Sequence, residues 1–131
     1  MGTSKEILKD VVTKRKSALG ENEKLFPPLN VQAVAISPHS VEVRWTDWHL
    51  KQDETIPDDR FYTIQYNTAE MSLEEYQYLN STERNMIVTN LKPSTLYDFS
   101  VKLVIGARKS DWSMTTSQMT MESSKYLRFF L

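Results

Sequence analysis

The sequence predicts an all-β domain in which seven short antiparallel strands form two sheets packed face to face. Three observations support this prediction. Apolar and polar residues alternate with a period of two over most of residues 28–122. Each alternating run is short and ends at residues that favour turns. Each predicted strand also has one polar face, which is typical of antiparallel sheets that cover a single core.

The predicted strands follow one another along the chain, separated by turns and by one long polar connection from Asp47 to Arg60. They comprise Val31–Ala35, Val41–Thr46, Tyr62–Tyr66, Tyr76–Tyr78, Met86–Leu91, Leu96–Ile105 and Met114–Met121. Side chains on the apolar faces of these strands form the predicted core, because they alternate with polar neighbours. The core residues expected are Trp45, Tyr62, Ile64, Tyr66, Leu91, Tyr97, Phe99 and Val101.

The two ends of the chain differ from this strand-rich part. Thr3 and Glu6 have capping-box spacing, and the apolar residues that follow them lie largely on one helical face until Gly20. Pro27 and Pro28 then begin an extended segment. We therefore expect three parts: a helix-prone or disordered extension over 1–26, the sandwich over 27–122, and a short tail over 123–131.

Composition and motifs argue against several classes of function. The net charge of the 131 residues is −1, whereas a nucleic-acid-binding protein is usually strongly basic. No stretch is long and apolar enough for a signal peptide or a transmembrane helix, so we expect no membrane insertion by this segment. There is no cysteine, and three glycines form no phosphate-binding loop.

Catalytic and metal-binding residues are also not grouped in the sequence. The only histidines, His39 and His49, fall in turns at opposite ends of the predicted sandwich, so we expect solvated loop residues rather than a metal or acid–base pair. No arrangement places a nucleophile beside a base. The sequence therefore predicts a protein that is not an enzyme and that has no cofactor and no metal site.

One order of residues resembles the fibronectin type III family. It runs through Pro28, Val31, Val41-x-Val43-x-Trp45, Tyr62-x-Ile64-x-Tyr66 and Leu91-x-Pro93-x-Thr95-x-Tyr97-x-Phe99-x-Val101. The resemblance implies an immunoglobulin-like β-sandwich in which Trp45 fills the space between the sheets. It also implies a tyrosine corner, in which the Tyr97 phenol bonds back to the turn that holds Leu91 and Pro93.

Three stretches are similar to a repeat, around the fifth, of the neogenin and deleted-in-colorectal-cancer receptor family. They are 45–63, 91–101 and 108–115. This resemblance implies a non-catalytic module from the extracellular part of a cell-surface guidance or adhesion receptor, with a netrin or a repulsive guidance molecule as its protein ligand. The alternative is an intracellular structural repeat of a scaffold or muscle-type protein, which the missing cysteine would also fit.

Four residues are candidates for partner binding. Arg108 and Lys109 are either solvated loop charges or contacts for an acidic partner or an anionic glycan. Trp112 either lies flat on the outer sheet face, on a cation such as Lys102, or contacts a partner, since tryptophan and arginine are common at binding hot spots. Trp48 either folds back onto the sandwich or is an exposed binding anchor.

Two further features concern the loops. The connection Asp47–Arg60 has five acidic and two basic side chains, a net charge of −3, and we expect a solvated acidic loop rather than a calcium site. Asn80-Ser81-Thr82 is the only N-glycosylation sequon and falls in a predicted loop. Since alternate turns of a sandwich share one end, we expect the 47–60 and 106–113 connections and the turn at Asn80 to converge.

Overall fold

The computed structural model describes residues 24–70 and 75–123, and these form a β-sandwich. The predicted N-terminal helix and most of the C-terminal tail lie outside the described residues. The strands are β1 (Leu29–Ser37), β2 (Ser40–Thr46), β3 (Arg60–Thr68), β4 (Gln77–Ser81), β5 (Asn85–Val88), β6 (Leu96–Ile105), β7 (Arg108–Lys109) and β8 (Thr116–Met119). Among residues 24–70 and 75–123, no helix is long and apolar enough to cross a membrane.

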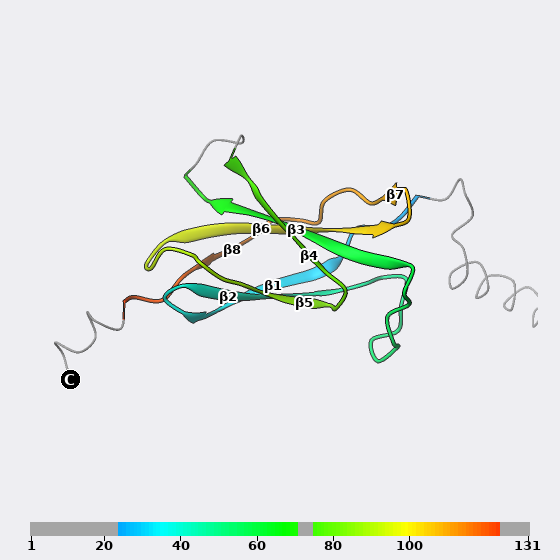
Figure 1. Ribbon diagram of the computed structural model, residues 1–131, viewed down its shortest axis with the longest axis horizontal. Coiled ribbons are helices and arrows are strands. Elements are labelled where there is room, and N and C mark those ends of the chain that lie inside the picture. The colour runs from blue at the N-terminus through cyan, green and yellow to red at the C-terminus, as the bar shows by residue number, and fades with distance from the viewer. Residues whose placement is uncertain (1–23, 71–74, 124–131) are drawn as a thin grey trace, which may run out of the picture.

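Two antiparallel sheets stack on each other, as Figure 1 shows. One has the order β1-β2-β5 and the other the order β4-β3-β6-β7, with β8 also paired to β6. β7 and β8 pair with opposite ends of β6. Together they form one interrupted edge, so the eight strands agree with the seven that the sequence predicts.

The core lies between the sheets. Trp45, Tyr62, Ile64, Leu91, Tyr97, Phe99 and Val101 are buried as predicted, and Tyr66 is partly buried beside them. The Trp45 and Tyr62 rings come from different sheets, and their centroids are 5.4 Å apart. Pairing of β2 with β5 and of β3 with β6 fixes which face of each strand is buried.

Two details at the ends of the sandwich bear on the sequence prediction. The Lys92 backbone N–H donates a 2.9 Å hydrogen bond to the Tyr97 hydroxyl, which confirms the tyrosine corner. Leu25, which the sequence analysis assigned to the extension, is 2% exposed and belongs to the core. The packed domain therefore includes Leu25, two residues before the expected start at residue 27.

Candidate functional site

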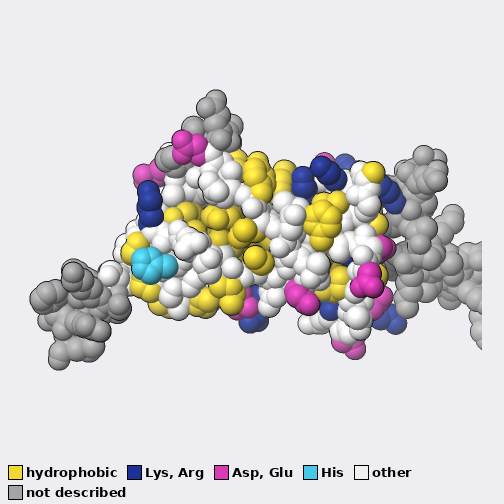
Figure 2. All heavy atoms as spheres, in the orientation of Figure 1, with side chains coloured by type: hydrophobic (Ala, Val, Ile, Leu, Met, Phe, Trp, Pro, Cys, Tyr) yellow, Lys and Arg dark blue, Asp and Glu magenta, His cyan; other side chains and the backbone are white. Residues whose placement is uncertain are grey.

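A long loop and a short turn meet at one end of the sandwich, on the right in Figure 1. Arg60 begins β3 and pairs with Ile105, which ends β6. The loop 47–59 before β3 and the turn 106–107 after β6 therefore share this end, which we call the loop pole. Acidic and basic side chains gather there in Figure 2. The predicted convergence is confirmed for the start of the 106–113 connection, whereas its last residue, Ser113, lies beside Val101 within β6.

Asn80 departs from the prediction, because it lies within β4 rather than in a turn. It pairs with Thr63 of β3, whose hydroxyl donates a 2.8 Å hydrogen bond to Asn80 Oδ1. The strand extends to Ser81, so the turn occupies 82–84 instead. Arg84 Nη2 in that turn donates to the Glu54 carbonyl at 2.7 Å, and this bond ties the turn to the loop pole.

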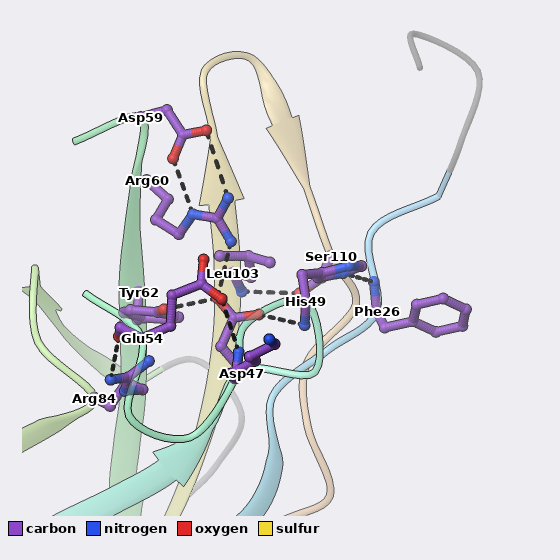
Figure 3. Close-up of polar contacts among 11 residues, drawn as sticks. Phe26, Asp47, His49, Glu54, Asp59, Arg60, Tyr62, Arg84, Leu103 and Ser110 are labelled. Atoms are coloured by element: carbon purple, nitrogen blue, oxygen red, sulfur yellow. Dashed lines mark hydrogen bonds and ion pairs between the residues drawn. The ribbon is translucent and has the colours of Figure 1, made fainter. Parts of the chain in front are cut away.

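Asp47 organises the base of the pole from a buried position, as Figure 3 shows. One carboxylate oxygen accepts from the His49 backbone N–H at 2.9 Å. The other accepts from the Tyr62 hydroxyl at 2.7 Å and from Arg60 Nη1 at 3.1 Å. The expectation of a solvated acidic loop is therefore wrong for Asp47, which is 2% exposed, since three donors replace its water.

The charges of this network stabilise one another. Burial disfavours the charged Arg60 guanidinium, but Asp59 and Asp47 outweigh burial and raise the pKa of Arg60. Burial raises the pKa of the Tyr62 phenol far above its ordinary value, and Asp47 adds to that effect. Both groups therefore keep their neutral-pH protonation states, and the network fixes the loop rather than moving protons.

His49 and Trp48 connect the loop to the N-terminal segment. His49 is 5% exposed, which corrects its expected place as a solvated loop residue, and its Nε2 accepts the Phe26 backbone N–H at 3.1 Å. The Trp48 and Phe26 ring centroids are 4.8 Å apart. Trp48 is still 39% exposed and Phe26 51%, so a partner contact through Trp48 stays a prediction. The ring folds back, yet it leaves apolar surface at the pole.

Arg108 and Lys109 lie on opposite faces of β7. Lys109 pairs with Val104 and Arg108 with Ile105, and cross-strand partners share a face. Lys109 therefore lies on the outer face, by which we mean the face of the β4-β3-β6-β7 sheet that points away from the other sheet. Arg108 lies on the side of the core. The expectation that the two residues act together at the pole is not supported by this register.

The edge between β7 and β8 carries Trp112 on a bulge. Ser110 N–H donates to the Leu103 carbonyl, and Ser110 Oγ accepts the Leu103 N–H, both at 2.9 Å. Ser113 makes the same exchange with Val101, at 2.8 and 2.9 Å. The edge uses one residue more than β6 between these two contacts, and the extra length projects Trp112 outward.

Trp112 lies over a lysine, as the sequence analysis anticipated. Lys102 Nζ is 4.6 Å from the indole centroid, and the Tyr78 ring centroid is 6.3 Å from it. Burial, and next the charge of Lys109, lower the pKa of Lys102. Lys102, Lys109 and Trp112 thus form one group, which we call the outer-face cluster, with Tyr78 beside it.

Metal-ligating side chains are not grouped in the part of the chain that the structure describes. Among residues 24–70 and 75–123, no three histidine, cysteine, aspartate or glutamate side chains could hold a metal ion.

Sequence reasoning missed the roles of Phe26 and Tyr78. Phe26 directly precedes Pro27 and follows the apolar Leu25, and that apolar pair was the available signal. Tyr78 is 58% exposed on β4, and its place near Trp112 follows only from how β4 pairs in the sheet.

The comparisons with known proteins agree with the described fold. A family model described as "Fibronectin type III domain" matches residues 26–119. The chain is 39% identical over 98 residues to neogenin of Homo sapiens, which is 75% of this chain and 7% of neogenin. It is 35% identical over 100 residues to the netrin receptor DCC of Rattus norvegicus, which is 76% of this chain and 7% of that receptor. The chain thus spans about 7% of the length of these relatives.

Solved structures show the same fold at lower identity. The FN5 domain of Drosophila Lar aligns with a TM-score of 0.59 at 22% identity, covering 76% of this chain and 99% of that one. The fn3 domain of human contactin 1 aligns with a TM-score of 0.61 at 23% identity, covering 75% and 79%. At these identities the likeness supports the sandwich architecture alone.

Proposed function

Because the chain belongs to the fibronectin type III family, we propose that it is a non-catalytic recognition module from the extracellular part of a cell-surface guidance receptor. Its ligand in this proposal is a secreted protein of the netrin or repulsive-guidance type. The observation that carries the proposal is the 39% identity to neogenin over 98 residues, with 35% identity to the netrin receptor DCC beside it.

The outer-face cluster is the surface that we propose for the ligand. Lys109 is exposed, and Lys102 and Lys109 form no ion pair with a carboxylate among the described residues. Burial first, and next the charge of Lys109, lower the pKa of Lys102, and a carboxylate from a partner would offset the repulsion between the two cations. Trp112 provides the flat apolar surface common at the centre of protein interfaces.

Trp48 and Arg108 have different places in this proposal. Trp48 lies at the loop pole, so it would contact a ligand that extends beyond the outer face. Arg108 lies on the side of the core and would contribute little. An anionic glycan is the weaker candidate ligand, because two cations beside one aromatic ring on the outer face suit a protein carboxylate better than a long sulfated chain.

The test measures binding of the full chain to a purified netrin at low and at physiological salt. We expect Lys109→Glu to weaken binding at least tenfold at low salt, with a smaller effect at higher salt. Lys92→Glu makes the same charge change at an exposed site by the tyrosine corner and serves as the matched control. Equal affinities of the two variants would exclude the outer-face cluster, and no binding by the parent chain would exclude the netrin ligand.

A second candidate function is an intracellular structural repeat. Proteins of that class are not exposed to the glycosylation machinery, so the location can be tested directly. Expression in a secretory host should yield a secreted chain with a glycan on Asn80 if the receptor proposal holds. A chain that is retained and degraded in the secretory pathway would favour the structural repeat.

A further inference from the structure

A shallow hollow on the outer face is lined mainly by the glycosylation sequon itself. Its volume is about 300 Å³, and its walls are Phe61, Asn80, Ser81 and Thr82. That volume is at the lower end of the range for small-molecule sites. Ser81 is 8% exposed, and its hydroxyl bonds to the Glu83 and Asn85 carbonyls, so it fixes the wall. Phe61 is the only aromatic ring in the lining.

We propose that Asn80 carries an N-linked glycan and that the first sugar of this glycan occupies the hollow against the Phe61 ring. The inference rests on the proposed extracellular location. The sugar class is an N-acetylhexosamine pyranose, whose C–H face is apolar and loses contact with water when it packs on an aromatic ring.

The geometry of Asn80 is compatible with this attachment. Its Oδ1 accepts the Thr63 hydroxyl at 2.8 Å, and this bond fixes the plane of the amide. The glycan attaches through the other amide atom, Nδ2. A bond forms between Nδ2 and the anomeric carbon of a lipid-linked sugar donor as the bond from that carbon to the pyrophosphate oxygen breaks. The pyrophosphate leaves with the electron pair of that bond, and the proton lost from Nδ2 passes to the released pyrophosphate or to solvent. The Thr63 hydrogen bond can therefore persist in the glycosylated chain.

Tyr78 is the other aromatic ring on which the first sugar could pack, since it lies on the same strand and face two residues before Asn80. Its ring is turned toward Trp112, with the centroids 6.3 Å apart. Phe61, by contrast, lines the same hollow as Asn80. The hollow therefore favours Phe61, and a glycan seated there extends toward the loop pole.

This placement has a consequence for the outer-face cluster. Thr63 pairs with both Asn80 and Lys102, so the three residues form one row across the sheet. Two strand spacings, roughly 10 Å, separate the ends of the row. A glycan free to lean along the row would cover Lys102, whereas a glycan held on Phe61 leaves Lys102 uncovered and lies in the next row, which Phe61 shares with Val104 and Lys109.

The experiment compares the full chain secreted from a eukaryotic host with the same chain made in bacteria, where Asn80 is not glycosylated. The intact mass of the chain shows whether Asn80 carries a glycan, and the melting temperature shows whether the first sugar packs on the protein. We expect the glycosylated chain to melt roughly 2–5 °C higher. Phe61→Leu, which removes the ring but keeps apolar bulk, should abolish this difference at unchanged occupancy, whereas Tyr78→Leu should preserve it.

Proton NMR of the glycosylated chain provides a second readout that does not depend on stability. Protons of the first sugar should be shifted upfield by the Phe61 ring, and the shift should disappear in Phe61→Leu. The proposal is overturned if the secreted chain has no glycan on Asn80, if the melting difference survives Phe61→Leu, or if it vanishes in Tyr78→Leu. Netrin binding by the unglycosylated chain is measured separately, so the recognition proposal can stand or fail independently.

Discussion

Lys102 contacts Trp112 on the outer face, with Lys102 Nζ 4.6 Å from the indole centroid. The contact depends on the bulge between Ser110 and Ser113, which places Trp112 opposite the one β6 residue between Val101 and Leu103. A cation over an indole at the protein surface contributes only about 0.5–1 kcal/mol. The position of the ring is therefore set mainly by the serine hydrogen bonds.

Removing one serine hydroxyl should test this dependence. Ser113 is 8% exposed, and its Oγ accepts the Val101 N–H at 2.9 Å. Ser113→Ala leaves that buried N–H without an acceptor, so we expect a loss of about 1–3 kcal/mol in the free energy of unfolding. Ser117→Ala, at an exposed position of β8, should change stability by less than about 0.5 kcal/mol. Equal losses in the free energy of unfolding in urea for the two variants would show that the Ser113 hydroxyl has no special role.

The buried carboxylate at the loop pole should be the most sensitive polar site in the domain. Asp47→Ala removes the acceptor for Tyr62 and Arg60 and leaves a guanidinium that is 4% exposed without its buried partner. We expect a loss of about 3–5 kcal/mol.

Asp59 offers an internal comparison, because it pairs with the same guanidinium but is 53% exposed. Asp59→Ala should cost less than about 1 kcal/mol. If chemical denaturation gave similar losses for the two variants, the buried bond to Asp47 would not be the dominant one.

Alkaline pH should destabilise the fold through Tyr62. Burial and Asp47 raise the pKa of this phenol above its ordinary value of 10.0. Near neutral pH the phenol is protonated in both states, so the shift has no effect. Above about pH 10 the unfolded chain loses the proton while the folded chain keeps it, and stability falls as pH rises.

The measurement is the free energy of unfolding in urea at about pH 9 and about pH 11. The slope of this free energy against pH reports the difference in bound protons between the unfolded and the folded chain. Tyr62→Phe should reduce the slope but not remove it, because burial also raises the pKa of Tyr66. A Tyr62→Phe variant with the parental slope would contradict the argument.

The strand core could be predicted from the sequence because burial in a sandwich repeats every two residues. Trp45, Ile64 and Phe99 each lie between two polar neighbours, and that pattern is local. The tyrosine corner was also recoverable, since Leu91, Pro93 and Tyr97 have fixed spacing. These predictions needed no knowledge of which strands pair.

The loop pole could not be predicted in the same way. Asp47 and His49 are buried by partners distant in sequence, Tyr62 and Phe26, and nothing in the local composition marks them. The separation of Arg108 from Lys109 likewise follows from pairing with β6, where the sequence suggested only a turn. Polar residues were assigned to solvent because most polar loop residues are solvated.

The largest apolar contribution of a single residue should come from Trp45. It is 5% exposed and fills the space beside Tyr62 of the other sheet. Trp45→Ala should cost about 3–5 kcal/mol through the lost transfer free energy and the cavity left behind. Calorimetry of the variant is the measurement, and a melting temperature equal to that of the parent would contradict the strand register.

Truncation should locate the true start of the domain. Lys24 forms a 2.9 Å ion pair with Asp111, but both side chains are more than 70% exposed, at 72% and 73%. An ion pair in water contributes little, so removing residues 1–24 should leave the melting temperature nearly unchanged.

Extending the truncation by two residues changes the expectation. Leu25 is 2% exposed in the core, and the Phe26 N–H bonds to the buried His49. Removing 1–26 opens a cavity where the leucine packed, and we expect a loss of about 2–5 kcal/mol, as for other large-to-small core changes. Leu25→Ala in the full chain should reproduce most of it. If the two truncated chains had the same melting temperature, the N-terminal segment would contribute nothing to the core. The sandwich would then begin at Pro27, as the sequence alone suggests.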